Sequence, residues 1–231
     1  MNTSINFLRR TKLEILSKEK DVSLLKESEL LYSSYQEMME MQLVYNAAIK
    51  QVSTKLEILN EEFNVRHSRN PIHHVEGRLK SPQSIIKKLQ RKNMDINIKT
   101  ARELNDIAGV RVVCAYLDDV YNIAEMLLSQ TDVKLVKLQD YIKEPNFNGY
   151  RSLHLDIEVP VFLSDHIEKV VVETQIRTVA QDFWASLEHD IRYKSDKHIP
   201  KDICDDMLQS SDEIAAIDIK MQETFKKIQN I

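Results

Sequence analysis

Glycine and proline are scarce in this sequence. Its 231 residues contain three glycines and five prolines, and none of them comes before Pro71. Because these two residue types interrupt regular structure, their scarcity favours long helices, and we expect residues 1 to about 68 to be helical. The chain also lacks a G-x-x-x-x-G-K-[ST] segment, which excludes a P-loop. Any nucleotide site must therefore have a different design.

Cysteine and long apolar runs are equally scarce. Cys114 and Cys204 lie far apart and flank no motif, which excludes a disulfide framework and a cysteine zinc site. No apolar run approaches the roughly 20 residues that span a bilayer. No secretory signal follows the basic residues near the N-terminus. We therefore expect reduced thiols, a cytoplasmic location and no membrane partner.

What the chain does contain suits a globular protein. Apolar residues make up 42% of it and charged residues 29%, enough for a core and a polar surface. The net charge is −4, so the surface as a whole does not attract polyanions. Any anion-binding function must come from a local cluster of basic residues.

After Pro71 the pattern alternates between strands and helices. Apolar and β-branched runs predict strands at 72–80, 109–117, 133–138, 150–159 and 168–176. Ser81-Pro82 predicts a helix start, with serine as the N-cap and proline at the first helical position. We expect that helix to reach about residue 93. Further helices are expected from Asp118-Asp119, as caps, to about 129, from 178 to about 193, and from Pro200 onward.

This order predicts an α+β fold. We expect a mixed β-sheet of about five strands, flanked by helices and extended by helices at both ends. The expected domains are a helical N-terminal extension at 1–68, a core at 69–196 and a helical C-terminal extension at 197–231. The apolar stripes of the end helices suit contacts between subunits, although helices that pack on their own core would look the same.

A basic cluster occupies residues 77–93, which include no acidic residue. Its cations are Arg78, Lys80, Lys87, Lys88, Arg91 and Lys92. Arg78 and Lys80 share one face of a strand, whereas Ser84, Lys88 and Arg91 share one face of the following helix. The helix N-terminus also favours anions. The cluster predicts a polyphosphate cradle, with a solvated basic face or an RNA-backbone patch as the alternatives.

Two carboxylates lie in settings that suit catalysis. Asp106 comes just before a buried strand, and Glu173 lies within the last strand, where it shares a face with Gln175 and Arg177. Phosphoryl-type transfer needs a divalent cation, usually Mg²⁺ held by one or two carboxylates, and a group that accepts a proton. Alternatively, Asp106 caps a turn and Glu173 pairs with an arginine.

The segment 148–154 is predicted to be a turn that enters a strand. Tyr150, Ser152 and His154 would share one face of that strand. An exposed tyrosine at the mouth of a strand can stack on a nucleobase, and a nearby Asn or His can contact its edges. A tyrosine that merely covers a hairpin turn would give the same pattern.

Four segments in this order resemble the synthetase domain of the RelA/SpoT-homologue family, which makes guanosine tetra- and pentaphosphate. They are residues 77–80 with the Ser84 and Lys88 helix, 106–111, 140–154, and 172–178 followed by Trp184-Ala185 and Glu188-His189. The spelling of residues 146–150 is similar to that of small, stand-alone synthetases of the RelP type. The resemblance implies transfer of pyrophosphate from ATP to the 3′-hydroxyl of GDP or GTP, with release of AMP, in the bacterial stringent response.

The resemblance also implies a role for each matching residue. ATP would be bound by Arg78 and Arg111, on either side of adenine, and by Lys80, Ser84, Lys88 and Arg91, on its phosphates. Mg²⁺ would be held by Asp106 and Glu173, and Glu173 would also act as the base. The acceptor nucleotide would be bound by Tyr150, which stacks on guanine, and by Asn148, His154 and Gln175.

One departure from the family concerns the acceptor phosphates. Larger members often carry a lysine just before the Pro-Asn-Gly-Tyr stretch, and here Lys143 would take its place. Such small synthetases are typically homotetramers, so we expect a homotetramer, and RNA binding could coexist with synthesis as regulation. Two other functions compete: nucleotidyl transfer to RNA ends, for which the usual G-S-x-x-x-G opening is missing, and non-catalytic RNA binding through the basic cluster.

Overall fold

The computed structural model describes residues 2–194 and 199–229. The chain divides into two compact units, residues 1–43 and 44–231. Helix α1 (Asn2–His67) begins in the first unit and ends in the second. The long N-terminal helix is thus confirmed. The three predicted domains stay a prediction, and their boundary at 196/197 lies outside the described residues.

The second unit alternates strands and helices. In chain order its further elements are β1 (Ile72–Leu79), α2 (Pro82–Arg91), α3 (Ile98–Ala101), β2 (Ala108–Cys114), α4 (Leu117–Leu128), β3 (Lys134–Asp140), β4 (Leu153–Phe162), β5 (Ile167–Thr178), α5 (Val179–Lys194) and α6 (Lys201–Gln229). The sequence did not predict the short helix α3, which the Asn97 side chain caps by accepting from the Thr100 amide at 2.9 Å. None of the described helices is long and apolar enough to cross a membrane.

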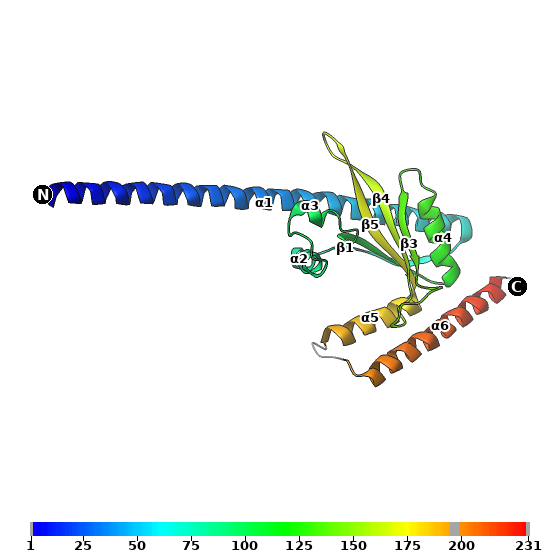
Figure 1. Cartoon of the computed structure of the whole chain (residues 1–231). Coiled ribbons are helices and arrows are strands. Elements are labelled where there is room, and N and C mark those ends of the chain that lie inside the picture. The colour runs from blue at the N-terminus through cyan, green and yellow to red at the C-terminus, as the bar shows by residue number, and fades with distance from the viewer. Residues whose placement is uncertain (1, 195–198, 230–231) are drawn as a thin grey trace. The chain divides into compact units, whose positions relative to one another are not determined.

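Among the described residues, five strands form one mixed sheet in the order β1-β2-β5-β4-β3. Strands β2 and β5 are parallel, and every other neighbouring pair is antiparallel. Figure 1 shows the sheet with α4 along it and with α5 and α6 side by side below its end. The predicted α+β fold with about five strands is confirmed.

The hydrophobic core covers one face of this sheet. Alternate strand residues such as Val110, Leu155 and Val172 are almost fully buried, and so is Ile123 of α4, a helix that contacts β2 and β5. Helix α1 also approaches closely at Gly77, where an added Cβ would lie 2.4 Å from Ile49. The strand residues between the buried ones point to the opposite face, which leaves that face available for a site.

The structure confirms one of the two predicted helix N-caps and corrects the other. Ser81 caps α2 as predicted, because its hydroxyl accepts from the Ser84 amide at 3.3 Å and Pro82 follows it. The predicted cap of α4 by Asp118 and Asp119 is wrong, since Tyr116 is the N-cap and makes no side-chain cap bond. Both aspartates lie in the first turn, where partners elsewhere hold them: Asp119 is fully buried against Arg69.

Candidate active site

Two rows of polar side chains cross the open face of the sheet. Strand register aligns the first row as Arg78, Gly109, Glu173, Asp156 and Lys137. It aligns the second row as Glu76, Arg111, Gln175, His154 and Gln139. Segments far apart in the sequence therefore present their polar groups together, with Glu173 and Gln175 on the central strand β5.

A hollow on the β1–β2 side brings the two predicted adenine-binding arginines together. It is lined by Glu76, Arg78, Gly109, Val110, Arg111, Glu173 and Gln175. The Arg111 guanidinium lies 3.2 Å from the Glu76 carboxylate and 3.9 Å from that of Asp182. Because Gly109 has no side chain, the hollow stays open between Arg78 and Arg111. A planar group would fit between two guanidinium groups of this kind.

The basic cluster converges on Asp106. Lys80 Nζ and Lys88 Nζ each lie 2.6 Å from Asp106 Oδ2, so the residue directly after β1 and a residue of α2 meet at one carboxylate. Burial alone would raise the pKa of Asp106, but hydrogen bonds from the two lysines hold it below its ordinary value. Its other oxygen, Oδ1, is buried without a hydrogen-bond partner among the described residues.

Ser84 and Arg91 lie on the same helix as Lys88. Ser84 is exposed, and its hydroxyl accepts from that of Ser81 at 2.9 Å. Arg91 is exposed in the last turn of α2, one turn beyond Lys88. Because Ile85 and Leu89 bury the other side of α2, the predicted polar face is correct. It extends the cationic surface that begins at Lys80.

Glu173 is a half-buried acid at the centre of the rows. Gln175 Nε2 donates to Glu173 Oε2 at 2.8 Å, so the expected alternative of an arginine partner is not what the structure shows. Burial raises the pKa of Glu173, and the neighbouring acids Asp106 and Asp156 raise it further. A carboxylate with a raised pKa is a better proton acceptor than an ordinary one.

The pair Tyr150 and His154 forms the β4 side of the site, but not through a shared strand face. Gly149 has a φ of +88°, and β4 begins only at Leu153, so Tyr150 belongs to the turn. Its hydroxyl still lies 3.0 Å from His154 Nε2. Ser152 is buried, and its hydroxyl donates to the Ile176 carbonyl at 3.2 Å.

Both rings are more enclosed than the sequence indicated. Tyr150 is half-buried against the cluster of Trp184, Ala185 and Met207, so the prediction of an exposed tyrosine is wrong. Burial lowers the pKa of His154 to about 4, so it is neutral at pH 7. Its Nδ1 lies 4.0 Å from Glu173 Oε1, and this neutral ring can only hydrogen-bond, not form an ion pair.

Two predicted acceptor-binding residues make other contacts. The Asn148 side-chain amide donates to Glu188 on α5 at 3.0 Å. The Lys143 ammonium lies 3.4 Å from the Asp140 carboxylate and 5.2 Å above the Tyr121 ring of α4. Since α4 covers the opposite face of the sheet, the structure does not bring Lys143 into the rows.

Two residues of the first row were not predicted. Lys137 is exposed on β3, and Asp156 on β4 accepts from the Asn105 side chain at 3.0 Å. Lys137 faces Asp156 in register, and Asp156 faces Glu173. Alternation along β4 could have placed Asp156 on the His154 face, but nothing local in the sequence aligned Lys137 with it. A cation thus lies on this face where Lys143 was expected.

The two carboxylates fit a magnesium ion whose coordination shell is completed by substrate phosphates and water. Asp106 Oδ1 is unpartnered, and Glu173 lies close enough for the two charges to influence each other. Within the described residues no group of three or more His, Cys, Asp or Glu side chains gathers as a metal cage. Mg²⁺ is commonly held by one or two carboxylates together with substrate phosphates and water.

Known proteins are similar to this chain in both sequence and fold. Residues 77–198 match the family described as "Region found in RelA / SpoT proteins". The chain is 44% identical over 187 residues to GTP pyrophosphokinase YwaC of Bacillus subtilis, covering 80% of this chain and 89% of that protein. It is 34% identical to GTP pyrophosphokinase YjbM of the same organism, covering 80% and 87%.

Solved structures give the same result. Small alarmone synthetase 1 of Bacillus subtilis, bound to its product pppGpp, superposes with a TM-score of 0.78 at 31% identity. The match covers 84% of this chain and 99% of that one. Small alarmone synthetase 2 of the same organism gives 0.74 at 43% identity, covering 80% and 97%. The chain belongs to the RelA/SpoT family.

Proposed function

We propose that the open face of the sheet is the active site of a (p)ppGpp synthetase, with ATP on the β1–β2 side and GDP or GTP on the β4–β3 side. The chain is an enzyme of the GTP pyrophosphokinase class, and its reaction transfers pyrophosphate from ATP to a guanine nucleotide. The position of Glu173 supports this assignment of the ATP side and the acceptor side. Glu173 lies on the central strand, between the arginine hollow and the Tyr150–His154 pair.

On the donor side, we assign adenine to the space between Arg78 and Arg111. The phosphates would then reach the cationic face of Lys80, Ser84, Lys88 and Arg91. Planar, polarisable guanidinium groups stack on aromatic rings, which supports this assignment. Phosphate oxygens would compete with Asp106 for Lys80 and Lys88, since both ammonium groups now rest on that carboxylate.

Asp106 and Glu173 are the residues that would hold Mg²⁺. When bound, the ion would neutralise charge on the polyphosphate. Loss of the two lysines to phosphate would leave both oxygens of Asp106 available as ligands. Removal of divalent cations with a chelator is expected to abolish synthesis, and activity that persists without them would contradict this part of the proposal.

On the acceptor side, Tyr150 is the guanine platform, with His154 and Gln175 as polar partners. Asn148 would act mainly through the turn, because its amide is engaged with Glu188. Lys137, on the same face, is better placed than Lys143 to contact the acceptor phosphates. The half-buried ring, with one side on an apolar cluster, presents a fixed stacking surface.

Glu173 is the proton acceptor in the transfer. It takes the proton of the acceptor 3′-hydroxyl while that oxygen bonds to the β-phosphorus of ATP. The bond from the β-phosphorus to the oxygen that bridges to the α-phosphorus then breaks, and AMP leaves. Much of the rate enhancement would come from positioning the two nucleotides and neutralising their charge.

The test is product analysis by mass with GDP and GTP in competition. The purified chain with ATP, Mg²⁺ and the two acceptors is expected to yield AMP and 3′-pyrophosphorylated guanine nucleotides. Nucleotidyl transfer to RNA would instead release pyrophosphate and join label to RNA. If no 3′-pyrophosphorylated product forms at any magnesium concentration, the proposed function fails.

Three further assignments belong to the same proposal. A homotetramer is supported by an apolar stripe on α5, where Val179, Phe183 and Leu187 are 45%, 59% and 50% exposed. A cytoplasmic location is supported by two cysteines that are both free thiols. RNA binding as regulation is supported by the exposed cations of α2, and it would be strongly salt-dependent.

A further inference from the structure

Helix α6 lies against the turn that carries the guanine platform. The Ser211 hydroxyl donates to the Gly149 carbonyl at 2.5 Å, and the Asp212 carboxylate accepts from the Arg151 guanidinium at 2.8 Å. These two consecutive residues of α6 therefore contact the residues on either side of Tyr150. Ser211 is 3% exposed, so its bond is shielded from water.

The backbone of the turn at Gly149 is in close contact with Ser211 of α6. Gly149 has a φ of +88°, and its amide donates to the Asn146 carbonyl at 2.8 Å. A Cβ added to Gly149 would lie 2.8 Å from the Cβ of Ser211. Glycine is therefore required both by its backbone conformation and by this contact. The turn cannot shift toward α6, and the Ser211 bond opposes a shift away from it.

The same helix also supports the Tyr150 ring. Met207 of α6 packs with Trp184 and Ala185 of α5 in the buried cluster on which Tyr150 rests. The Trp184 indole donates to the Met207 carbonyl at 3.1 Å, which ties α5 to α6 at this point. Both the backbone before Tyr150 and the ring itself thus depend on where α6 lies.

Helix α6 is held in place further along its length. The buried Thr178 hydroxyl donates to the Asp218 carboxylate at 2.6 Å, which joins α6 to the end of β5. Near its C-terminus, Phe225 stacks on Tyr116 with ring centroids 4.2 Å apart. These contacts fix the helix against the core independently of the turn.

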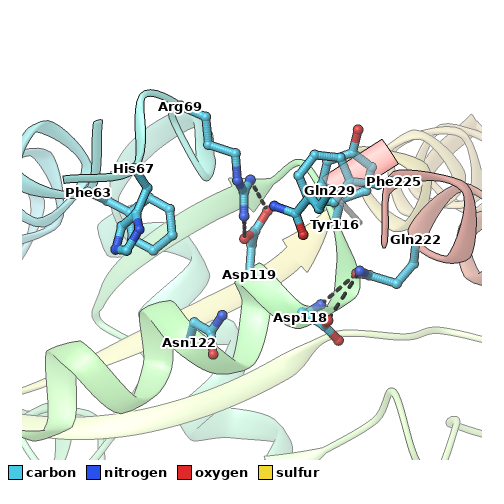
Figure 2. Close-up of a pocket in the computed structure, with 10 residues that line it drawn as sticks. All are labelled: Phe63, His67, Arg69, Tyr116, Asp118, Asp119, Asn122, Gln222, Phe225 and Gln229. Carbon is cyan, nitrogen blue, oxygen red and sulfur yellow. Dashed lines mark hydrogen bonds and ion pairs between the residues drawn. The ribbon is translucent and has the colours of Figure 1, made fainter. Parts of the chain in front are cut away.

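Figure 2 shows this C-terminal anchor. It surrounds a cavity of about 300 Å³ between the end of α1, the start of α4 and the end of α6. Both terminal nitrogens of Arg69 bind the Asp119 carboxylate, and the guanidinium carbon lies 4.9 Å from the Phe225 ring centroid. Gln222 contacts Asp118 through its amide and carbonyl groups. The Arg69 guanidinium carbon also lies 5.2 Å from the Phe63 ring centroid, so this residue links the end of α1 to the end of α6 and anchors α6.

We propose that Ser211 and Asp212 are positioning residues for the acceptor nucleotide: they hold the Gly149–Arg151 turn so that Tyr150 presents its ring to guanine. This inference rests on the proposed function, in which Tyr150 is the guanine platform. Neither residue touches the reacting atoms. Each acts by raising the fraction of molecules whose turn is ready to bind, and the apparent affinity for the acceptor follows that fraction.

The size of the effect follows from the two contacts. Ser211→Ala removes a shielded hydrogen bond and is expected to raise the KM for GDP and GTP roughly tenfold. Asp212 is 63% exposed, so Asp212→Ala is expected to raise the same KM by only about twofold to fivefold. The KM for ATP is expected to stay unchanged for both variants, because the donor residues lie on β1, β2 and α2 and, for Lys80, directly after β1.

Two neighbouring residues of α6 supply matched controls. The Ser210 hydroxyl donates to the Asp206 carbonyl at 2.8 Å within the helix, and Glu213 accepts from Gln209 at 2.8 Å, also within the helix. Ser210→Ala and Glu213→Ala therefore remove the same groups without touching the turn. The experiment measures kcat, the KM for each nucleotide and the Tm of the full chain and all four variants.

The expected result is a rise in acceptor KM for Ser211→Ala and Asp212→Ala but not for the controls. If both variants keep the wild-type acceptor KM, the positioning role is overturned while the proposed function stands. Equal rises in the KM for ATP and for the acceptor, with a lower Tm, would also overturn it. If Ser211→Ala does not fold, the exposed Asp212→Ala decides the question. If wild type itself makes no product, the proposed function and this inference fail together.

Discussion

Replacing Glu173 by glutamine separates chemistry from folding more cleanly than any other single change in the site. Glutamine keeps the size of the side chain and an oxygen that can accept from Gln175, whose amide now lies 2.8 Å from the carboxylate. It cannot accept a proton and is a poor ligand for Mg²⁺. Loss of a general base alone costs roughly 10²- to 10⁴-fold in rate, so kcat is expected to fall by at least that much.

The same substitution is expected to leave the fold at least as stable. Burial raises the pKa of Glu173, so the folded chain binds this proton more tightly than the unfolded chain. The stability that such a group contributes is present below its unfolded pKa and is lost as the pH rises through the folded pKa. At pH 7 the raised pKa is therefore a cost to the folded state of wild type, and Glu173→Gln removes that cost.

The assay pairs AMP release with thermal unfolding. Glu173→Gln is expected to show a Tm at pH 7 equal to or above that of wild type, with the difference shrinking below about pH 4. Glu158→Gln is the matched control, because Glu158 is 25% exposed on the same face, against 23% for Glu173. Its ion pairs are loose, with Lys169 at 3.7 Å and Lys134 at 4.0 Å. A Glu173→Gln enzyme with more than about a tenth of wild-type activity would refute the assignment of the base.

Three other substitutions test separate parts of the site and of the fold. Gly109→Val is expected to raise the KM for ATP roughly tenfold or more, because the valine side chain would fill the hollow between Arg78 and Arg111. The Tm is expected to stay unchanged, because a Cβ added to Gly109 would lie 3.6 Å from its nearest neighbour, an ordinary van der Waals distance. Lys137→Ala is expected to raise the KM for GDP and GTP roughly tenfold, and an equal effect of Lys143→Ala would contradict this assignment. Arg69→Met is expected to lower the free energy of unfolding in urea by about 3–5 kcal/mol, since it leaves fully buried Asp119 without its partner.

Local patterns in the sequence were enough to predict several parts of this structure. Alternation along residues 168–176 placed Glu173 and Gln175 on one face, because side chains of a strand point to opposite faces in turn. The Ser81-Pro82 start and the polar face of α2 followed from helix geometry in the same way. These features depend on neighbours within one turn or one strand, so the sequence carries them directly.

Features that depend on register between strands were not visible. Lys137 enters the site only because it faces Asp156, which in turn faces Glu173 on a third strand. Lys143 follows Asp140, and register places Asp140 beside Leu153, on the face that α4 covers. A shift of one residue in this pairing would exchange the two faces, and no local pattern reports the shift.

The conformation of the turn before β4 depends on contacts with α6, near the C-terminus, and local sequence does not predict these contacts. The sequence indicated an exposed tyrosine, yet the structure buries half of Tyr150 against α5 and α6. The positive φ of Gly149 delays the start of β4 to Leu153, and Ser211 fills the space beside the glycine. Contacts about 60 residues apart decide this geometry, which a motif of seven residues does not contain.

The network around Asp106 links donor binding to the metal site. Lys80 and Lys88 both rest on Asp106 Oδ2, so the lysines keep this half-buried carboxylate charged. ATP phosphates would draw both cations away, and a buried carboxylate that loses two cations is costly unless another cation replaces them. In the proposed function, Asp106 and Glu173 would hold a Mg²⁺ ion, which would supply that charge. The same residues would therefore favour binding of the metal together with ATP over binding of either alone.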